Sequence, residues 1–344
     1  MSPLTSSIII SSLATGTIIT ASSYHWLMAW IGLEINTLAI IPLISKKHHP
    51  RSTEAATKYF LTQTAASALI LFSSTINAQI TGTWDITQLT TTQSNILLSM
   101  ALAMKLGLAP AHFWLPEVLQ GSTMNTALII STWQKLAPMT LLYTTANNLP
   151  TPMLLIMGAL SALVGGWGGL NQTQLRKIMA FSSIAHFGWI LTISFLLTNI
   201  MTLNLIMYLI MTTTMFSTLI MSNSKTIKDT MTLSTLSPTL TTLTALTLLS
   251  LGGLPPLSGF IPKWLILEEL TNQNLIPMAF LMAMSALLSL FFYLRLTYTT
   301  TLTLAPNTTT TPHKWRFTQQ NTTLLISTTT PLSLLLLPAT PLLT

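Results

Sequence analysis

The sequence predicts an all-α, polytopic transmembrane protein, and three observations support this fold class. Half of the 344 residues are hydrophobic, only 6% are charged, and the mean hydropathy is +0.61. Soluble domains carry about 25% charged residues, so the polar surface of a soluble protein is missing here. Apolar segments of about 20 residues, enough to cross a bilayer, recur along the chain. The net charge of +7 comes from short clusters between these segments, which is typical of membrane topology signals rather than of a nucleic-acid-binding surface.

We expect about eleven membrane-spanning helices joined by short loops. The first begins at the N-terminus, where there is no basic region and no clear cleavage site, so we interpret it as a retained span rather than a signal peptide. Thr and Ser are frequent in the spans, where their hydroxyl groups can bond to helix carbonyls. The expected spans lie near 3–22, 25–44, 56–79, 94–116, 123–146, 150–170, 175–196, 198–222, 237–270, 274–300 and 322–342.

The basic clusters fall between these spans in a regular way. All of them lie in even-numbered loops, whereas the odd-numbered loops hold Asp85, Glu268 and Glu269. The positive-inside rule therefore supports the span count and predicts the N-terminus on the matrix or cytoplasmic side and the C-terminus on the opposite side. The clusters are Lys46, Lys47 and Arg51, then Arg176 and Lys177, then Lys225 and Lys228, and finally Lys314 and Arg316.

Four ionisable residues lie near the middle of apolar segments: Glu34, Lys105, Lys135 and Lys263. Each costs about 2.5–3.5 kcal/mol at a helix centre, and a Leu would pack as well without that cost. The alternative is that a Lys near a span end lifts its ammonium into the headgroups. This alternative fits Lys58 and Arg295, but it fits Glu34, Lys105 and Lys135 poorly, because each of these has about ten residues of apolar segment on both sides.

Lysine is an informative choice at such positions. A Lys that alternates between an apolar environment and one beside a carboxylate can take up and release a proton. Our hypothesis is that Glu34 and Lys105 form a switchable pair and that Lys135 and Lys263 are later stations. The sequence thus predicts the movement of protons or other small cations.

Two spans are interrupted by Gly and Pro, near 107–116 and near 252–262, and each interruption lies beside a Lys. Proline removes an amide donor, and unwound backbone is tolerated in a membrane only where it is buried in protein or lines a hydrated cavity. Interrupted spans at matching places in two halves indicate an inverted-repeat transporter. We expect a first inverted repeat at 1–147, a second at 148–300, and a loop and C-terminal span at 301–344.

Three further residues have both a functional and a structural interpretation. His112, beside the first break, is either a proton relay or a residue that hydrogen-bonds the backbone of the broken helix. His186 is either a relay or an interhelical hydrogen-bond partner, and Glu117 fits the mouth of a cavity better than the path. The remaining histidines show no metal-like spacing with carboxylates, so we expect no metal site.

The run from Trp30 to Pro42, the run from Met104 to Glu117 and the run from Gly252 to Phe260 together resemble the antiporter-like subunit family of mitochondrial NADH:ubiquinone oxidoreductase, respiratory complex I. The resemblance covers essentially the whole chain. It implies a proton-translocating subunit of the membrane arm, with two inverted five-helix repeats that each contain a discontinuous helix.

The resemblance also assigns roles by motif. Glu34 is similar to the family's intramembrane glutamate, and Lys105 to its lysine on the first broken helix. Lys135 resembles the central connecting lysine, and Lys263 the terminal lysine of the half-channel that leads out. His186 resembles a member of the hydrated axis between the halves.

The implied cofactors, namely NADH, FMN, iron–sulfur clusters and ubiquinone, are bound by other subunits, which agrees with the absence of Cys. The implied partners are other membrane-arm subunits, the lipid bilayer with phospholipids such as cardiolipin, and protons. The implied location is the mitochondrial inner membrane. Family members with fourteen spans carry three more at the start, so here a partner subunit would supply that wall.

Two alternatives remain at this point. A Na⁺/H⁺ antiporter subunit would use the same fold and lysines. A structural anchor would use its charges only to bind neighbouring helices.

Overall fold

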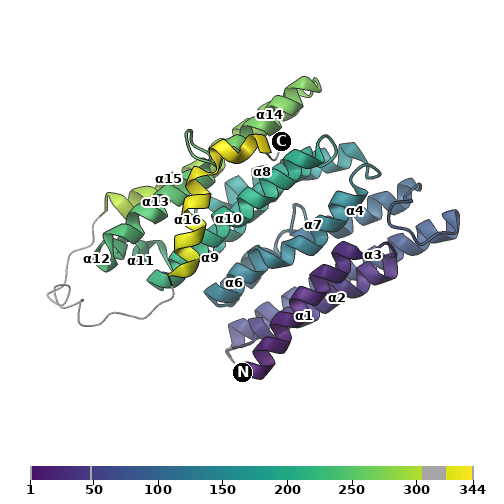
Figure 1. The fold of residues 1–344 in the computed structure, drawn as a ribbon, viewed down its shortest axis with the longest axis horizontal. Helices are drawn as coiled ribbons and strands as arrows, with labels where there is room; N and C mark the ends of the chain where they lie inside the picture. Colours follow the sequence, from purple (N-terminus) through teal and green to yellow (C-terminus); the bar gives the residue numbers. More distant parts are fainter. Residues whose placement is uncertain (1, 47–48, 304–322, 343–344) are drawn as a thin grey trace. The chain divides into compact units, whose positions relative to one another are not determined.

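The computed structural model describes residues 2–46, 49–303 and 323–342 and consists almost entirely of helices (Figure 1). No strand forms within these ranges, which confirms the expected all-α class. Lys47, Lys314 and Arg316 lie outside them. In the described part of the chain, six helices are long and apolar enough to cross a membrane. They are α1 (Pro3–Ser22), α2 (Trp26–Ile44), α3 (Pro50–Thr81), α8 (Thr151–Gly169), α10 (Thr198–Ser222) and α15 (Ile276–Thr301).

The other expected spans are three helices in two parts, one 12-residue helix and one further helix of 19 residues. The interrupted spans consist of α4 (Thr92–Leu106) with α5 (Trp114–Gly121), and of α13 (Pro238–Gly252) with α14 (Phe260–Asn272), so both predicted breaks are confirmed. A further interruption that we did not predict divides α6 (Met124–Ser131) from α7 (Trp133–Thr145). The remaining elements are α9 (Leu175–Ile193), the short α11 (Ile227–Met231) and α12 (Leu233–Leu236), α16 (Leu324–Leu335) and a 3-10 turn at Leu337–Leu342.

The chain forms two compact units. Unit 1 comprises Met1–Val164 and Ser183–Thr198, and unit 2 comprises Gly165–Ser182 and Asn199–Thr344. Each unit contains one of the two Gly/Pro breaks.

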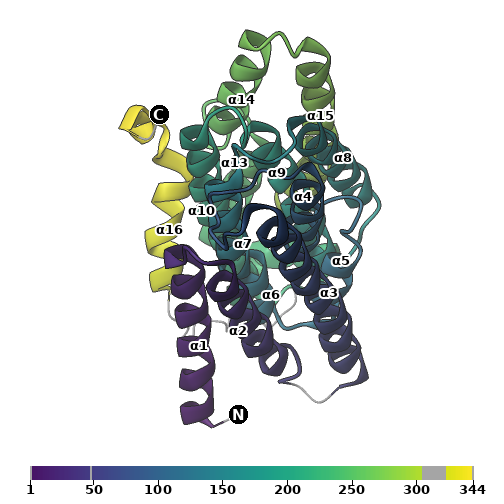
Figure 2. The same cartoon turned by 90° about the vertical axis from the view of Figure 1, so that its right-hand side faces the viewer.

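In unit 1, α1 and α2 approach each other closely because both carry glycine at the crossing (Figures 1 and 2). A Cβ on Gly32 would lie 2.9 Å from the Gly16 carbonyl oxygen, and a Cβ on Gly16 would lie 3.0 Å from the Gly32 carbonyl oxygen. Small residues that admit close backbone contact are the usual basis of helix association in membranes, where burial of apolar surface gives no driving force.

Loops at one end of unit 1 are tied together by backbone bonds. Trp26 N–H donates to the Trp84 carbonyl at 3.1 Å, and Ile86 N–H donates to the Tyr24 carbonyl at 3.0 Å. The His25 ring stacks on the Trp84 ring with 5.7 Å between centroids. The first and third loops therefore lie on the same side, as alternating spans require.

In unit 2 the two basic loops are joined in the same manner. Leu175 N–H donates to the Lys225 carbonyl and Ile227 N–H to the Thr173 carbonyl, both at 3.1 Å. The two loops that carry Arg176 and Lys225 are thus on one side, which is the arrangement that the parity of the basic residues predicted.

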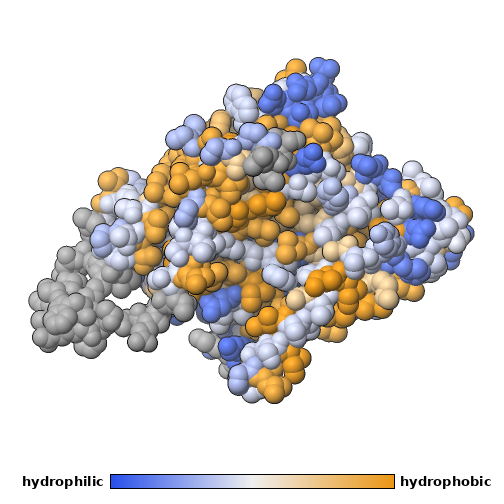
Figure 3. All heavy atoms as spheres, viewed as in Figure 1, coloured by the Kyte–Doolittle hydropathy of each residue, from blue (hydrophilic) through white to orange (hydrophobic). Residues whose placement is uncertain are grey.

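Hydrophobic side chains are spread over much of the visible surface, whereas the most hydrophilic ones gather at ends of helices, for example where α14 meets the turn to α15 (Figure 3). α3 is the longest helix described, with 32 residues. At 1.5 Å per residue it measures about 48 Å, whereas the hydrocarbon core of a bilayer is about 30 Å thick. Part of α3 therefore extends beyond that core.

We expect Gly32→Ala to separate α1 from α2, because the added Cβ would lie 2.7 Å from the Thr20 methyl and 2.9 Å from backbone atoms of α1. Overpacking of this kind costs about 1–3 kcal/mol, which exceeds the gain of up to about 1 kcal/mol from replacing a helical glycine by alanine. The amount of variant protein assembled into its native membrane complex should fall on a native gel. Thr15→Ala, on the exposed face of α1, is the control and should assemble normally; equal assembly of both variants would contradict the crossing described here.

Candidate functional site

The first break begins where α4 ends in a Schellman motif. Gly107 adopts the left-handed conformation with φ +71°, which a residue without Cβ reaches at little cost. Its N–H donates to the Met104 carbonyl at 3.2 Å, and Leu108 N–H donates to the Ala103 carbonyl at 2.9 Å. The motif satisfies these two carbonyls but leaves the carbonyl of Leu106, the last helical residue, pointing out of the helix end.

α13 ends in the same way at the second break. Gly253 has φ +78°, its N–H donates to the Ser250 carbonyl at 2.9 Å, and Leu254 N–H donates to the Leu249 carbonyl at 3.3 Å. Here the carbonyl of the last helical residue, which the motif leaves over, is that of Gly252.

At each break, a lysine ammonium donates a hydrogen bond to the carbonyl of the last helical residue. Lys135 Nζ, from α7, donates to the Leu106 carbonyl, and Lys263 Nζ, from α14, donates to the Gly252 carbonyl at 2.8 Å. Both ammonium groups thus lie against the negative end of a helix dipole, where a cation is stabilised. The sequence placed these lysines inside the membrane but did not show that each one binds the end of a half-helix.

Glycine also makes room for the second contact. A Cβ on Gly253 would lie 2.9 Å from Lys263 Cδ and 3.0 Å from Nζ, so only glycine leaves space for the ammonium there. At the start of α14, a Cβ on Gly259 would lie 1.8 Å from the Ser250 carbonyl oxygen. The two halves of this broken helix are therefore in direct backbone contact.

Lys105 lies in the last turn of α4 and is buried, with 4% of its surface exposed. Its Nζ is shielded from solvent and has no hydrogen-bond partner, and the same is true of Oε2 of Glu34 on α2. The two charges are close enough to interact electrostatically without forming a hydrogen bond. An acid and a base in this arrangement have unused hydrogen-bonding capacity in a buried site, which is costly for a purely structural pair.

Lys135 is 1% exposed and lies between two aromatic rings. Its Nζ is 4.9 Å from the centroid of the Phe187 ring and 5.8 Å from that of Trp114. Trp114 also donates its indole N–H to the Met104 carbonyl at 3.1 Å, next to the break. We did not predict either aromatic residue, although Trp114 follows the break directly and Phe187 follows His186 in the sequence.

The interruption between α6 and α7 lies at Thr132, three residues before Lys135. Pro138 lies inside the regular part of α7, and its missing hydrogen bond concerns Gln134, so it does not account for an interruption at Thr132. The interruption places Lys135 in the first turn of α7.

The two histidines occupy buried positions in unit 1. His112 lies inside the first break, 7% exposed, with Nδ1 3.3 Å from the Pro110 carbonyl oxygen. This contact is the structural alternative that we gave for it. His186 is 6% exposed on α9, one residue before Phe187. Unit 1 therefore brings Lys105, Lys135 and His112 to the break between α4 and α5, while Lys263 belongs to unit 2.

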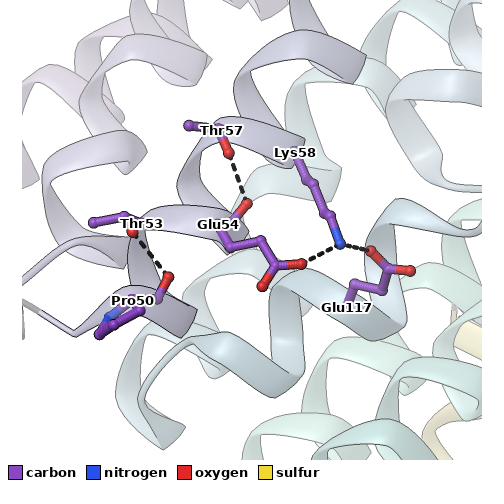
Figure 4. Close-up of polar contacts among 6 residues, drawn as sticks. All are labelled: Pro50, Thr53, Glu54, Thr57, Lys58 and Glu117. Carbon is purple, nitrogen blue, oxygen red and sulfur yellow. Dashed lines mark hydrogen bonds and ion pairs between the residues drawn. The ribbon is translucent and has the colours of Figure 1, made fainter.

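Lys58 and Arg295 make contacts that the sequence did not predict. Lys58 on α3 forms ion pairs with Glu54, at 2.5 Å, and with Glu117 on α5, at 2.6 Å (Figure 4). All three side chains are exposed, so Glu117 lies at the surface, as expected for a residue outside the path. Arg295 in unit 2 donates to the carbonyls of Leu170 and Gln172, so its charge binds protein backbone and not only headgroups.

No group of three or more His, Asp or Glu side chains with the geometry of a metal site occurs among the residues that the structure describes.

Comparison with known proteins defines the class. A family model described as NADH:quinone oxidoreductase/Mrp antiporter, TM, matches residues 23–289, and the chain belongs to this family of antiporter-like membrane proteins. A second model, NADH dehydrogenase subunit 2 C-terminus, matches residues 290–344. The chain is 58% identical over 344 residues to NADH-ubiquinone oxidoreductase chain 2 of Varanus nebulosus, with all of both chains covered. It is also 58% identical to that of Xenopus laevis, with 99% of each chain covered. Within the family it therefore groups with the chain 2 proteins.

Two solved structures are similar to this chain. A chain of respiratory complex I from Thermus thermophilus with bound aureothin has a TM-score of 0.82 at 26% identity, covering 96% of this chain and 78% of that one. A chain of the Mrp complex from Dietzia sp. DQ12-45-1b has a TM-score of 0.77 at 18% identity, covering 87% and 61%, and this likeness concerns the fold alone.

Gly253→Ala tests the space around Lys263. Gly82→Ala is a matched control, because Gly82 has nearly the same φ, +72°, but nothing lies within 4 Å of its added Cβ. Both variants incur left-handed strain of about 1–2 kcal/mol, and Gly253→Ala adds overpacking of about 1–3 kcal/mol. The solubilised protein with Gly253→Ala should therefore unfold at a lower temperature than that with Gly82→Ala. Equal melting temperatures would show that Lys263 does not occupy this space.

Proposed function

We propose that the chain is an antiporter-like membrane-arm subunit of NADH:ubiquinone oxidoreductase that translocates protons through buried Glu, Lys and His side chains. Redox chemistry in other subunits drives the movement. The observation that carries the proposal is the Glu34–Lys105 pair in unit 1, in which the ammonium of the buried Lys105 and one buried oxygen of the half-buried Glu34 lack hydrogen-bond partners. A packing role would satisfy these groups, whereas a group that must exchange a proton has to remain available.

The roles of the residues follow from their surroundings. Glu34 and Lys105 exchange a proton as their mutual distance or hydration changes. Lys135 on α7, whose ammonium binds the end of the half-helix that carries Lys105, is the next station in unit 1. His112 lies in the break that follows this half-helix, and His186 precedes Phe187, whose ring lies beside the Lys135 ammonium. Lys263 has the corresponding role in unit 2 as the lysine of the exit half-channel.

The proposed organisation is the one that the sequence suggested. Residues 1–147 and 148–300 form two inverted repeats, and 301–344 form a loop and a C-terminal span. The identical Schellman motifs at the ends of α4 and α13 support this assignment.

The proposed setting is the mitochondrial inner membrane, with the N-terminus in the matrix and the C-terminus in the intermembrane space. The basic loops joined in unit 2 support this orientation. The partners are other membrane-arm subunits and phospholipids such as cardiolipin. NADH, FMN, iron–sulfur clusters and ubiquinone bind to those other subunits.

A Na⁺/H⁺ antiporter subunit is the second candidate, because the family includes Mrp antiporters and the Dietzia chain has the same fold. The full-length similarity to chain 2 proteins favours the respiratory complex.

We expect Lys105→Ala and Glu34→Gln to abolish most NADH-driven proton translocation, because each removes one partner of the exchanging pair. Proton uptake by sealed vesicles, divided by the NADH oxidation rate, measures the effect. Glu54→Gln makes the same chemical change at an exposed carboxylate and should leave that ratio unchanged. Full translocation by Lys105→Ala would exclude the proposed role. Normal translocation with poor assembly would instead identify a structural anchor.

A native gel of mildly solubilised membranes distinguishes the two leading functions. The chain, located by mass spectrometry, should migrate with a very large band that carries NADH:quinone reductase activity. Migration as a small, NADH-inactive species, together with sodium-driven proton exchange in vesicles, would favour the antiporter.

A further inference from the structure

We propose that Lys135 and Lys263 are also positioning residues: each ammonium is a charge-dependent cap on the C-terminal end of a half-helix, α4 or α13. The inference rests on the proposed function, since it treats both lysines as proton stations. It adds that gain or loss of a proton at the lysine changes how firmly the end of that half-helix is held.

The geometry is the same in both units. Each half-helix ends in a Schellman motif that satisfies two carbonyls through the next two amides. In each, the carbonyl of the final helical residue, Leu106 or Gly252, accepts from a lysine Nζ. The donor comes from a different helix, so the cap is a tertiary contact and not a local feature of the turn.

Charge decides the strength of such a cap. A hydrogen bond from an ammonium is roughly twice as strong as one between neutral groups, and a cation also interacts with the negative end of the helix dipole. A neutral lysine amine keeps a weaker donor and loses the dipole interaction. Inside the membrane no bulk water replaces the lost bond.

In unit 1 the capped turn carries the first proton station. Lys105 immediately precedes Leu106, so the Lys135 ammonium holds the turn from which the Lys105 side chain projects. Loss of the proton from Lys135 therefore loosens the segment that sets the distance between Lys105 and Glu34. Two neighbouring stations are thereby coupled through backbone, without direct contact of their side chains.

The surroundings of Lys135 suit this role. The Trp114 and Phe187 rings lie beside its ammonium and stabilise a cation without taking its proton. The titratable groups on the elements around it include Glu34 on α2, Lys105 on α4, His112 in the break and His186 next to Phe187.

In unit 2 the cap holds the break itself. Lys263 belongs to the second half of the same interrupted span, so its bond to Gly252 joins α14 to α13. Ser258, inside the break, donates its hydroxyl to the Ser333 carbonyl of α16. Loss of the proton from Lys263 would therefore loosen the break, and the hydrogen bond from Ser258 to Ser333 would transmit this change to the C-terminal helix α16.

Hydrogen exchange of the intact complex tests the proposal. Lys135→Met removes the donor at similar length, whereas Lys135→Arg keeps charge and donors but does not release its proton. In Lys135→Met we expect peptides that contain Gly107 and Leu108 to exchange about tenfold faster than wild type, which corresponds to about 1.4 kcal/mol. Lys135→Arg should restore wild-type exchange although its proton translocation is lost.

Three controls make the result specific. Lys105→Met removes the neighbouring ammonium, which does not bond to the helix end, and should leave this exchange unchanged. Lys263→Met should accelerate exchange at Gly253 and Leu254 only, and Lys263→Arg, whose partly exposed site has more room, should restore it.

Two outcomes would overturn the cap. They are wild-type exchange in both Met variants, or equal acceleration in the Met and Arg variants of Lys263. Retained proton translocation in Lys135→Met would instead contradict the proposed function, because that readout is independent of the exchange measurement.

Discussion

The structure depends on one constraint: backbone carbonyls exposed by a broken helix inside a membrane need partners from the protein itself. α4 and α13 meet this constraint identically. A left-handed glycine turns the chain, two amides donate to carbonyls of the last turn, and a lysine from another helix donates to the carbonyl of the last helical residue. Two of the four intramembrane charges, those of Lys135 and Lys263, thus bind the carbonyl ends of half-helices.

This arrangement connects structure with proton chemistry. A lysine that only neutralised a carboxylate would be fixed by its partner, and a buried lysine with neither a hydrogen bond nor an opposite charge nearby would be too costly to keep. The carbonyl end of a helix is intermediate between these cases. Its carbonyl stabilises the charged form of a lysine but cannot take the proton from it. Lys135 and Lys263 occupy such sites, while Lys105 and Glu34 are left without hydrogen-bond partners close to one of them.

Much of this could be predicted from sequence, for identifiable physical reasons. Long apolar segments and the basic loops between them predicted the helical class. Gly107 and Gly253, with the prolines near them, predicted both breaks. The hydrogen-bond partners of Lys135 and Lys263 could not be predicted, because composition and spacing do not show which side chain of a distant span contacts a given carbonyl. Trp114 and Phe187 looked like ordinary apolar residues.

Two other misses have local causes. Helix pattern alone did not reveal the interruption at Thr132, since Pro138 lies inside the regular part of α7 and does not account for it. Lys58 near a span end suggested an ammonium among lipid headgroups, but spacing does not show that Glu117, on another helix, lies within 2.6 Å of it.

The length of α3 has a consequence for how the two ends of unit 1 respond to their surroundings. The helix is about 18 Å longer than the hydrocarbon layer, and Glu54 and Lys58 lie in its first turns. The ion pair between Lys58 and Glu117 therefore lies in an ion-rich medium. Its attraction is screened over about 10 Å and weakens as the salt concentration increases. α3 thus carries a salt-sensitive ion pair outside the bilayer and continues into the bilayer, where salt does not screen the buried charges. Ionic strength can therefore alter how firmly α5 is held by Lys58 without acting directly on those buried charges.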